Sequence, residues 1–112
     1  MGWKMAVAVS DYENEEMLFL GQEWEYSLTT GETSIGRGKE SAVKICFLNI
    51  SRSHCIVTVH PDGRATVRDC SKNGTFLNGR VLPQEEESPL RSGDTLTLGN
   101  GGPFTLLFQR EE

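Results

Sequence analysis

Turn signals and short alternating runs dominate this sequence, and helical periodicity is missing. No stretch of ten or more residues places apolar side chains at positions i, i+3, i+4 and i+7. Glycine supplies 12 of the 112 residues, and turn-forming clusters recur about every eight to twelve residues. This spacing is typical of a β-sandwich or a β-barrel. We therefore predict an all-β fold.

Alternating and β-branched runs mark the expected strands. Cys55–Val59 and Ala65–Asp69 flank the strong turn His60–Gly63 and predict a hairpin. The other expected strands and apolar runs are Lys4–Val9, Met17–Leu20, Trp24–Leu28, Thr33–Gly36, Thr75–Leu77, Thr95–Leu98 and Phe104–Gln109, with turns at Thr29–Gly31, Asn78–Gly79 and Asn100–Pro103. Pro89 interrupts the nearest helical candidate, Glu85–Arg91, which we expect to be an acidic surface loop.

The distribution of charge indicates a local anion site. The net charge is −5, but the segment from Gly36 to Arg80 holds eight basic residues against three acids, a balance of +5. The remaining residues hold three basic residues against thirteen acids, a balance of −10. An acidic chain with a basic middle favours one anionic ligand over a surface that binds nucleic acid throughout.

Apolar runs and cysteines indicate an intracellular setting. No apolar run approaches the roughly 20 residues of a membrane span, and the first residues lack the pattern of a signal peptide. The three cysteines, Cys46, Cys55 and Cys70, are odd in number and widely spaced. We expect buried thiols that act as small apolar side chains, not disulfides.

Catalytic and metal signatures are incomplete. Gly31–Gly36 has the glycine spacing of a phosphate-binding loop but lacks the lysine and the helix that should follow. Ser41 and Lys44 match a Ser-x-x-Lys pattern without its other motifs. His54 and His60 show no ligand spacing for zinc. We expect no enzymatic activity, no metal and no cofactor; a small hydrolase is the weakest alternative.

Polar residues gather where the predicted strands end. They form four groups: Gly36-Arg37, Ser51–His54, Ser71–Thr75 and Asn78-Gly79. An arginine fork and serine hydroxyls can hold a phosphate, and an asparagine amide can pair with both polar groups of an extended peptide. These residue types together indicate a site for an anion on a strand-like ligand.

The ordered set of these groups resembles the forkhead-associated (FHA) domain. Gly-Arg is followed by Ser-x-x-His, Asn-Gly-Thr and a further Asn-Gly, with Leu90–Gly99 downstream. The resemblance implies an eleven-stranded β-sandwich, of the SMAD/FHA-like type, whose loops at one end bind phosphothreonine peptides. We expect residues 1–112 to be one such domain, with a core of about 18–108 and an N-terminal strand and acidic segment at 1–16.

The resemblance also implies roles for individual residues. Arg37 and Ser51 match the phosphate-binding pair, Asn73 the residue that holds the peptide backbone, and Asn78 a backbone contact at the rim. Arg52 and Lys72 flank the phosphate, and we expect both to contact it. The structural supports of the site are Gly36, His54, Gly74 and Thr75, while Trp24 and Phe76 are expected in the core. Asn49 carries no charge that would select the third residue after the phosphothreonine, so that preference stays open.

Two uses of such a domain remain open. The first is recruitment of a kinase-phosphorylated partner, without direct contact to nucleic acid or membrane. The second is a phosphate-independent contact or self-association into a homodimer. Because such domains often serve nuclear DNA-damage signalling, and some checkpoint mediators carry one at the N-terminus, we expect an intracellular protein of the nucleus.

Overall fold

Eleven β-strands make up the described part of the chain. The computed structural model describes residues 2–9, 24–47, 49–100 and 104–111. The strands are β1 (Gly2–Val9), β2 (Trp24–Leu28), β3 (Gly31–Gly36), β4 (Val43–Lys44), β5 (Cys55–Val59), β6 (Ala65–Asp69), β7 (Thr75–Leu77), β8 (Arg80–Val81), β9 (Glu87–Leu90), β10 (Thr95–Leu98) and β11 (Phe104–Glu111). The all-β prediction is confirmed. Within these ranges no helix is long and apolar enough to cross a membrane.

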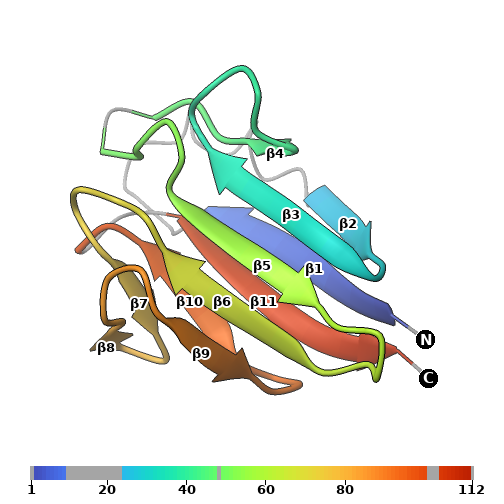
Figure 1. Ribbon diagram of the computed structural model, residues 1–112. Helices are drawn as coiled ribbons and strands as arrows, with labels where there is room; N and C mark the ends of the chain where they lie inside the picture. Colours follow the sequence, from blue (N-terminus) through green and yellow to red (C-terminus); the bar gives the residue numbers. More distant parts are fainter. Residues whose placement is uncertain (1, 10–23, 48, 101–103, 112) are drawn as a thin grey trace.

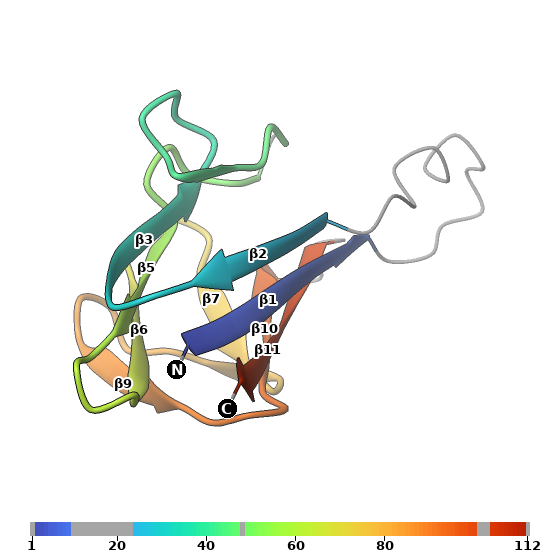
Figure 2. The same ribbon diagram turned by 90° about the vertical axis from the view of Figure 1, so that its right-hand side faces the viewer.

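The strands form two sheets that face each other. One sheet has the order β2-β1-β11-β10-β7-β8 and the other the order β4-β3-β5-β6-β9. Every pairing is antiparallel except that of β3 with the two-residue strand β4. Figure 2 shows the two layers edge-on, with β3, β5, β6 and β9 on one side and β1, β2, β10 and β11 on the other.

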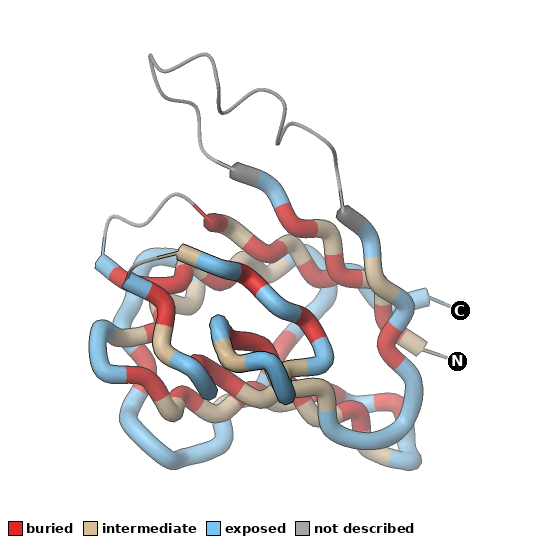
Figure 3. Tube along the Cα trace, turned by 90° about the horizontal axis from the view of Figure 1, so that it is seen from above, coloured by how far each residue is buried: buried red, intermediate tan, exposed pale blue. Residues whose placement is uncertain are grey.

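The core lies between the inner faces of the two sheets. In β5 and β6 every second residue is buried, because successive side chains of a strand point to opposite faces. Strand β10 and the first five residues of β11 show the same alternation, and Figure 3 shows buried residues alternating with less buried ones along much of the trace. The largest buried side chains are Phe108, Met5, Ile35, Ile50, Leu96, Leu98 and Leu106.

The predicted hairpin of β5 and β6 is present. Val59 pairs with Ala65 across the turn, and the His60 N–H donates to the Arg64 carbonyl at 2.7 Å. Gly63 adopts a φ of 92°, which side-chain-bearing residues rarely reach. The Trp3 indole N–H donates to the Gly63 carbonyl at 2.9 Å and thereby ties this turn to β1 in the other sheet.

The prediction of a loop at Glu85–Arg91 is wrong for its second half. Glu87–Leu90 forms β9, which pairs with β6 and places Pro89 opposite Thr66. Because β9 is an edge strand, the missing N–H of Pro89 costs no bond to a further strand. The two-residue strands β4 and β8 were also not expected from the pattern.

The cysteines differ in burial, which corrects the expectation of three buried thiols. Cys55 is fully buried in the core, whereas Cys46 is exposed and Cys70 is half-buried. Cys46 lies beyond β4, where the chain leaves the sheet. The predicted apolar run Met17–Leu20, the acidic segment Asp11–Glu16 and most of the turn Asn100–Pro103 lie outside the described residues, as does the side chain of Trp24.

The strand ends determine where the polar loops meet. Figure 1 shows that β3, β6 and β10 end, and β5, β7 and β11 begin, at the end of the sandwich opposite to both termini. The segments 37–42, 45–47, 49–54 and 70–74 therefore lie at one end. These segments carry most of the polar groups that the sequence singles out.

Candidate functional site

The turn after β3 packs directly on the segment that precedes β5. The Arg37 N–H donates to the Ser51 carbonyl at 2.9 Å, and the Gly38 N–H donates to the Arg52 carbonyl at 3.0 Å. Gly36 is buried at this contact, and a Cβ there would collide with the Arg52 carbonyl oxygen. Glycine is therefore required for the two segments to approach this closely, and the approach brings Arg37 next to Ser51.

The Arg37 side chain is exposed but anchored at one point. Its Nε–H donates to the Ile50 carbonyl at 2.9 Å. The two terminal amino groups of a guanidinium can still donate in parallel to one anion when Nε is occupied in this way. Arg37 is thus held in position for a bidentate contact.

Ser51 links two loops through its hydroxyl. The backbone N–H of Lys72 donates to the Ser51 Oγ at 2.9 Å. An oxygen that accepts this bond keeps its own O–H, which can donate to an anion. The same bond brings the segment that carries Lys72 and Asn73 to the side of Ser51 and Arg37.

His54 lies beneath the site and is fully buried. The Ser51 N–H donates to its Nδ1 at 3.1 Å, and its Nε2 lies 2.9 Å from the Gly74 carbonyl oxygen. Because an N–H can only donate and a carbonyl can only accept, Nδ1 must be unprotonated and Nε2 must carry the proton. Burial lowers the pKa of the His54 imidazole, against opposing contributions from the Gly74 carbonyl and the Asp69 carboxylate. The ring is therefore neutral and ties Ser51 to Gly74.

The loop between β6 and β7 is shaped by the buried carboxylate of Asp69. Its Oδ1 accepts from the Ser71 N–H at 3.0 Å, the Ser71 hydroxyl at 2.6 Å and the Thr75 hydroxyl at 2.8 Å. The Ser71 Oγ in turn accepts from the Gly74 N–H at 2.7 Å, and Gly74 adopts a φ of 95°. The sequence interpretation missed Asp69; the only signal was an aspartate two residues before a serine, a pattern that favours a local turn.

Asn73 projects from this loop and is exposed. Its Nδ2 donates to the Asn49 carbonyl at 2.9 Å, which orients the amide and leaves Oδ1 to accept. Asn49 and Asn73, with Gly99 and Asn100, line a cavity of about 210 Å³ beside the site. The amide therefore stands at the rim of a polar hollow with one acceptor available.

The charged groups of the site carry a positive excess. Arg37, Arg52 and Lys72 are all exposed. The ion pairs among the described residues involve only Lys4, Arg64 and Arg68 on the basic side. No carboxylate of the described residues therefore neutralises Arg37, Arg52 or Lys72 through an ion pair. Residues 2–9, 24–47, 49–100 and 104–111 contain no cluster of three or more metal-ligating side chains.

The structure does not bring Asn78 into this group. Asn78 lies beyond β7, and its Nδ2 donates to Asp94 Oδ1 at 3.0 Å. Its Oδ1 accepts from the Thr95 N–H at 3.0 Å and from the Thr95 hydroxyl at 3.3 Å. The amide joins the β7–β8 turn to β10, so its geometry is that of a structural residue. Phe76, expected in the core, is half-buried.

Comparison with known proteins identifies the architecture. The FHA domain profile matches residues 33–99. The E3 ubiquitin-protein ligase RNF8 of Rattus norvegicus is 36% identical over 87 residues, which is 73% of this chain and 18% of the ligase. The chain thus spans less than a fifth of the curated relatives of this kind that it matches.

Solved structures share the fold. The MEK1 FHA domain has a TM-score of 0.78 at 24% identity and covers 97% of this chain and 89% of its own. The N-terminal FHA domain of Saccharomyces cerevisiae Rad53p, solved in complex with a phosphothreonine peptide, has a TM-score of 0.76 at 19% identity and covers 96% and 93%. Because the FHA domain profile matches residues 33–99, more than half of the sequence, the chain belongs to the forkhead-associated (FHA) domain family.

Proposed function

We propose that this chain is a phosphothreonine-peptide-binding module that recruits a kinase-phosphorylated partner. The observation that carries the proposal is the hydrogen-bonded line from Arg37 to Ser51 to Lys72, which gathers a guanidinium, a hydroxyl and an ammonium at one end of the sandwich. These groups are complementary to a phosphate dianion. The phosphothreonine peptide held by the Rad53p domain, which has the same fold, supports the choice of ligand.

Each group has a separate role in this proposal. Arg37 holds two phosphate oxygens with its terminal amino groups, and the Ser51 hydroxyl donates to a third. Arg52 and Lys72 add attraction from both sides. The Asn73 Oδ1 accepts from a backbone N–H of the peptide, because its Nδ2 is engaged with Asn49. His54, Asp69, Gly36, Gly74 and Thr75 hold the loops.

A moderate affinity follows from these contacts. Each hydrogen bond to a charged group contributes about 1.5–3 kcal/mol. Three or four such bonds contribute about 4.5–12 kcal/mol, so that after the ordering of a flexible peptide the upper end of this range reaches the ~8 kcal/mol of a micromolar complex. This is the affinity expected of a reversible signalling contact.

The wider setting is also part of the proposal. We infer that residues 1–112 act as one domain, without catalysis of their own, inside the cell and in nuclear signalling such as the DNA damage response. The names of the relatives, a ubiquitin ligase and the serine/threonine-protein kinase RAD53, are compatible with a signalling role for the longer proteins. Capture of partners from nuclear extract before and after phosphatase treatment tests this setting.

The ligand class is tested with three pools of peptides. Oriented libraries that contain phosphothreonine, phosphoserine or unmodified threonine at the fixed position are passed over the immobilised protein. Retention of the phosphothreonine pool alone supports the proposal. If a folded sample retains none of the three pools, the proposal is contradicted and the phosphate-independent use is favoured. Sedimentation would then reveal a homodimer.

A further inference from the structure

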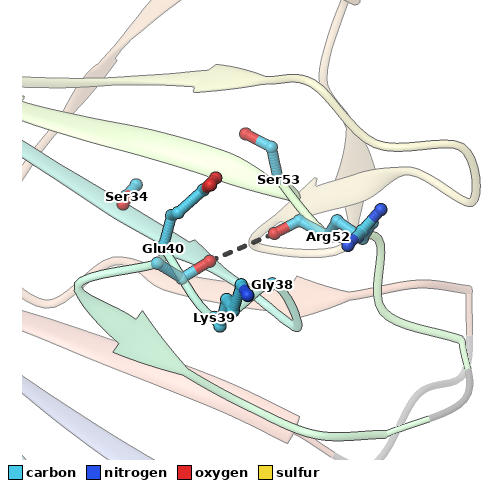
Figure 4. A pocket seen from close by; sticks show the side chains of 7 residues that line it. Ser34, Gly38, Lys39, Glu40, Arg52 and Ser53 are labelled. Carbon is cyan, nitrogen blue, oxygen red and sulfur yellow. Dashed lines mark hydrogen bonds between the residues drawn. The ribbon is translucent and has the colours of Figure 1, made fainter.

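A second basic hollow lies beside the proposed phosphate site. Its volume is about 460 Å³, and it lies between the β3–β4 loop and the segment before β5 (Figure 4). Its polar lining consists of Ser34, Lys39, Glu40, Ser41, Arg52 and Ser53. Only Arg52 is shared with the group of residues that we assign to the phosphothreonine.

The walls of this hollow are held in place by hydrogen bonds. The Ser41 hydroxyl donates to the Arg52 carbonyl at 3.1 Å, and the same carbonyl accepts from the Gly38 N–H at 3.0 Å. On the other wall the Ala42 N–H donates to the Ser34 Oγ at 3.0 Å. The Ser34 hydroxyl proton is then available to a ligand, since the oxygen acts as the acceptor. The hollow is a fixed feature of the two loops.

The charge of the hollow favours an anion with more than one negative charge. Lys39 and Arg52 are exposed cations, and neither forms an ion pair with Glu40 or with any other carboxylate of the described residues. Glu40 reduces the balance of the three side chains to +1, a sum that includes the Arg52 guanidinium shared with the phosphothreonine site. A carboxylate of charge −1 is therefore attracted weakly, whereas a phosphate with a charge of about −2 is attracted about twice as strongly.

We propose that this hollow binds a second phosphate monoester on the same peptide. The inference rests on the proposed function, because it takes the phosphothreonine at Arg37 and Ser51 as the first anchor. Arg52 directly follows Ser51, so the two sites are neighbours along the chain. An extended peptide advances roughly 3.3–3.6 Å per residue, and a second phosphorylated residue two to four positions away can therefore reach the hollow.

The experiment compares peptides that carry one or two phosphates. The reference peptide has phosphothreonine alone. In the test series a phosphoserine is added at each position from two to four residues before or after it, and in a parallel series the added residue is glutamate. Dissociation constants are measured by calorimetry in low salt. We expect at least one doubly phosphorylated peptide to bind about five- to tenfold tighter than the reference, and its glutamate counterpart within about twofold of the reference.

Two substitutions inside the hollow should act in opposite directions. Lys39→Ala should remove most of the advantage of the second phosphate, and Glu40→Gln should increase it about two- to threefold, because a like charge is removed. Both variants should bind the reference peptide with a dissociation constant within about twofold of that of the wild type. Lys44→Ala is the matched control, since Lys44 is an exposed lysine of the neighbouring strand β4 that does not line the hollow.

The outcomes separate the two proposals. If wild type binds the reference peptide but no second phosphate improves binding beyond glutamate, the second site is wrong and the proposed function stands. The second site is also overturned if Lys39→Ala retains the tighter binding of the doubly phosphorylated peptide. The same holds if Lys44→Ala reduces this advantage as much as Lys39→Ala does. If wild type does not bind the reference peptide, both proposals fall together.

Discussion

The Nε–H of Arg37 donates to the carbonyl oxygen of Ile50 at 2.9 Å, which fixes an exposed guanidinium to the backbone of a neighbouring loop. An arginine held at Nε loses less rotamer freedom when it binds an anion than one that moves freely in solvent. Ile50 itself is buried in the core. The position of the proposed phosphate contact is therefore set by packing inside the sandwich.

Replacement of Asp69 should affect both stability and binding. Asp69→Ala leaves the Ser71 and Thr75 donors buried without their shared acceptor, which should lower the free energy of unfolding by about 2–4 kcal/mol. Peptide binding should weaken in the folded fraction, because the loop that carries Asn73 loses the hydrogen bonds to Asp69 that fix its conformation. Chemical denaturation and calorimetry measure the two effects. Asp62→Ala is the control, since Asp62 is exposed and its hydrogen bonds to Arg64 lie within the β5–β6 turn; it should cost less stability than Asp69→Ala and leave peptide binding unchanged.

The two asparagines should separate binding from stability. Asn73→Ala should weaken phosphopeptide binding about tenfold and leave the melting temperature unchanged, since Asn73 is exposed. Asn78→Ala should lower the free energy of unfolding by about 1 kcal/mol or more, because the bonds to Asp94 and Thr95 are lost. Its effect on binding should be small. A loss of binding in Asn78→Ala at full stability would instead place Asn78 in the peptide contact.

The neutral state of His54 should make the fold sensitive to acid. The pKa of His54 is lowered in the folded state, whereas in the unfolded chain it is about 6.5. Below that pH the unfolded state binds more protons, so the free energy of unfolding falls as pH decreases until it passes the folded pKa. Urea unfolding between pH 7.5 and pH 5 should show this decline.

An NMR titration of the imidazole rings tests whether His54 is the group responsible for this decline in the free energy of unfolding. His60→Gln removes the other ring, which is half-buried and bonded to Thr66. The remaining His54 signal should titrate with a pKa below the usual value of about 6.5, because burial of the ring lowers it. A His54 ring that titrates at or above its usual pKa would contradict the assigned hydrogen bonds to Ser51 and Gly74.

The cysteines should react with iodoacetamide in order of exposure. Cys46 is exposed and should be labelled first, followed by the half-buried Cys70. Burial raises the pKa of the Cys55 thiol, and the group is enclosed in the core, so it should react only on unfolding. Mass spectrometry of the native protein over time measures the order. Early labelling of Cys55 would mean that β5 is not packed as described.

The parts of the fold that the sequence predicts are those governed by local chemistry. The β5–β6 hairpin follows from alternation and from the turn His60–Gly63, both of which act over a few residues. The edge strand β9 was missed because Pro89 and the neighbouring acids resemble a loop, and only its partner β6 makes it a strand. The exposure of Cys46 likewise depends on where β4 ends. Because β4 has only two residues, the sequence pattern does not show its end.

The residues of the site can likewise be divided into those that the sequence predicts and those that only the folded structure reveals. The polar groups that contain Arg37, Ser51, Lys72 and Asn73 were singled out by their residue types at strand ends, whereas the roles of the single residues followed from the resemblance to the FHA domain. The sandwich brings those strand ends together. Asp69 was missed because its role depends on three donors that meet only in the folded loop. The resemblance to the FHA domain implied a backbone contact for Asn78 at the rim, but β7 separates Asn78 from Gly74 and places it at the start of β10. Distance along a strand therefore decides which polar residues share a site.

The most direct test of the central claim is the affinity of wild type and Arg37→Ala for one phosphothreonine peptide and its unmodified form. Wild type should bind the phosphorylated peptide with a Kd on the order of 1–10 μM and the unmodified peptide at least fiftyfold more weakly. Arg37→Ala should reduce phosphopeptide binding at least tenfold with an unchanged melting temperature, since Arg37 is exposed. Equal binding of the phosphopeptide by a folded Arg37→Ala variant would contradict the account.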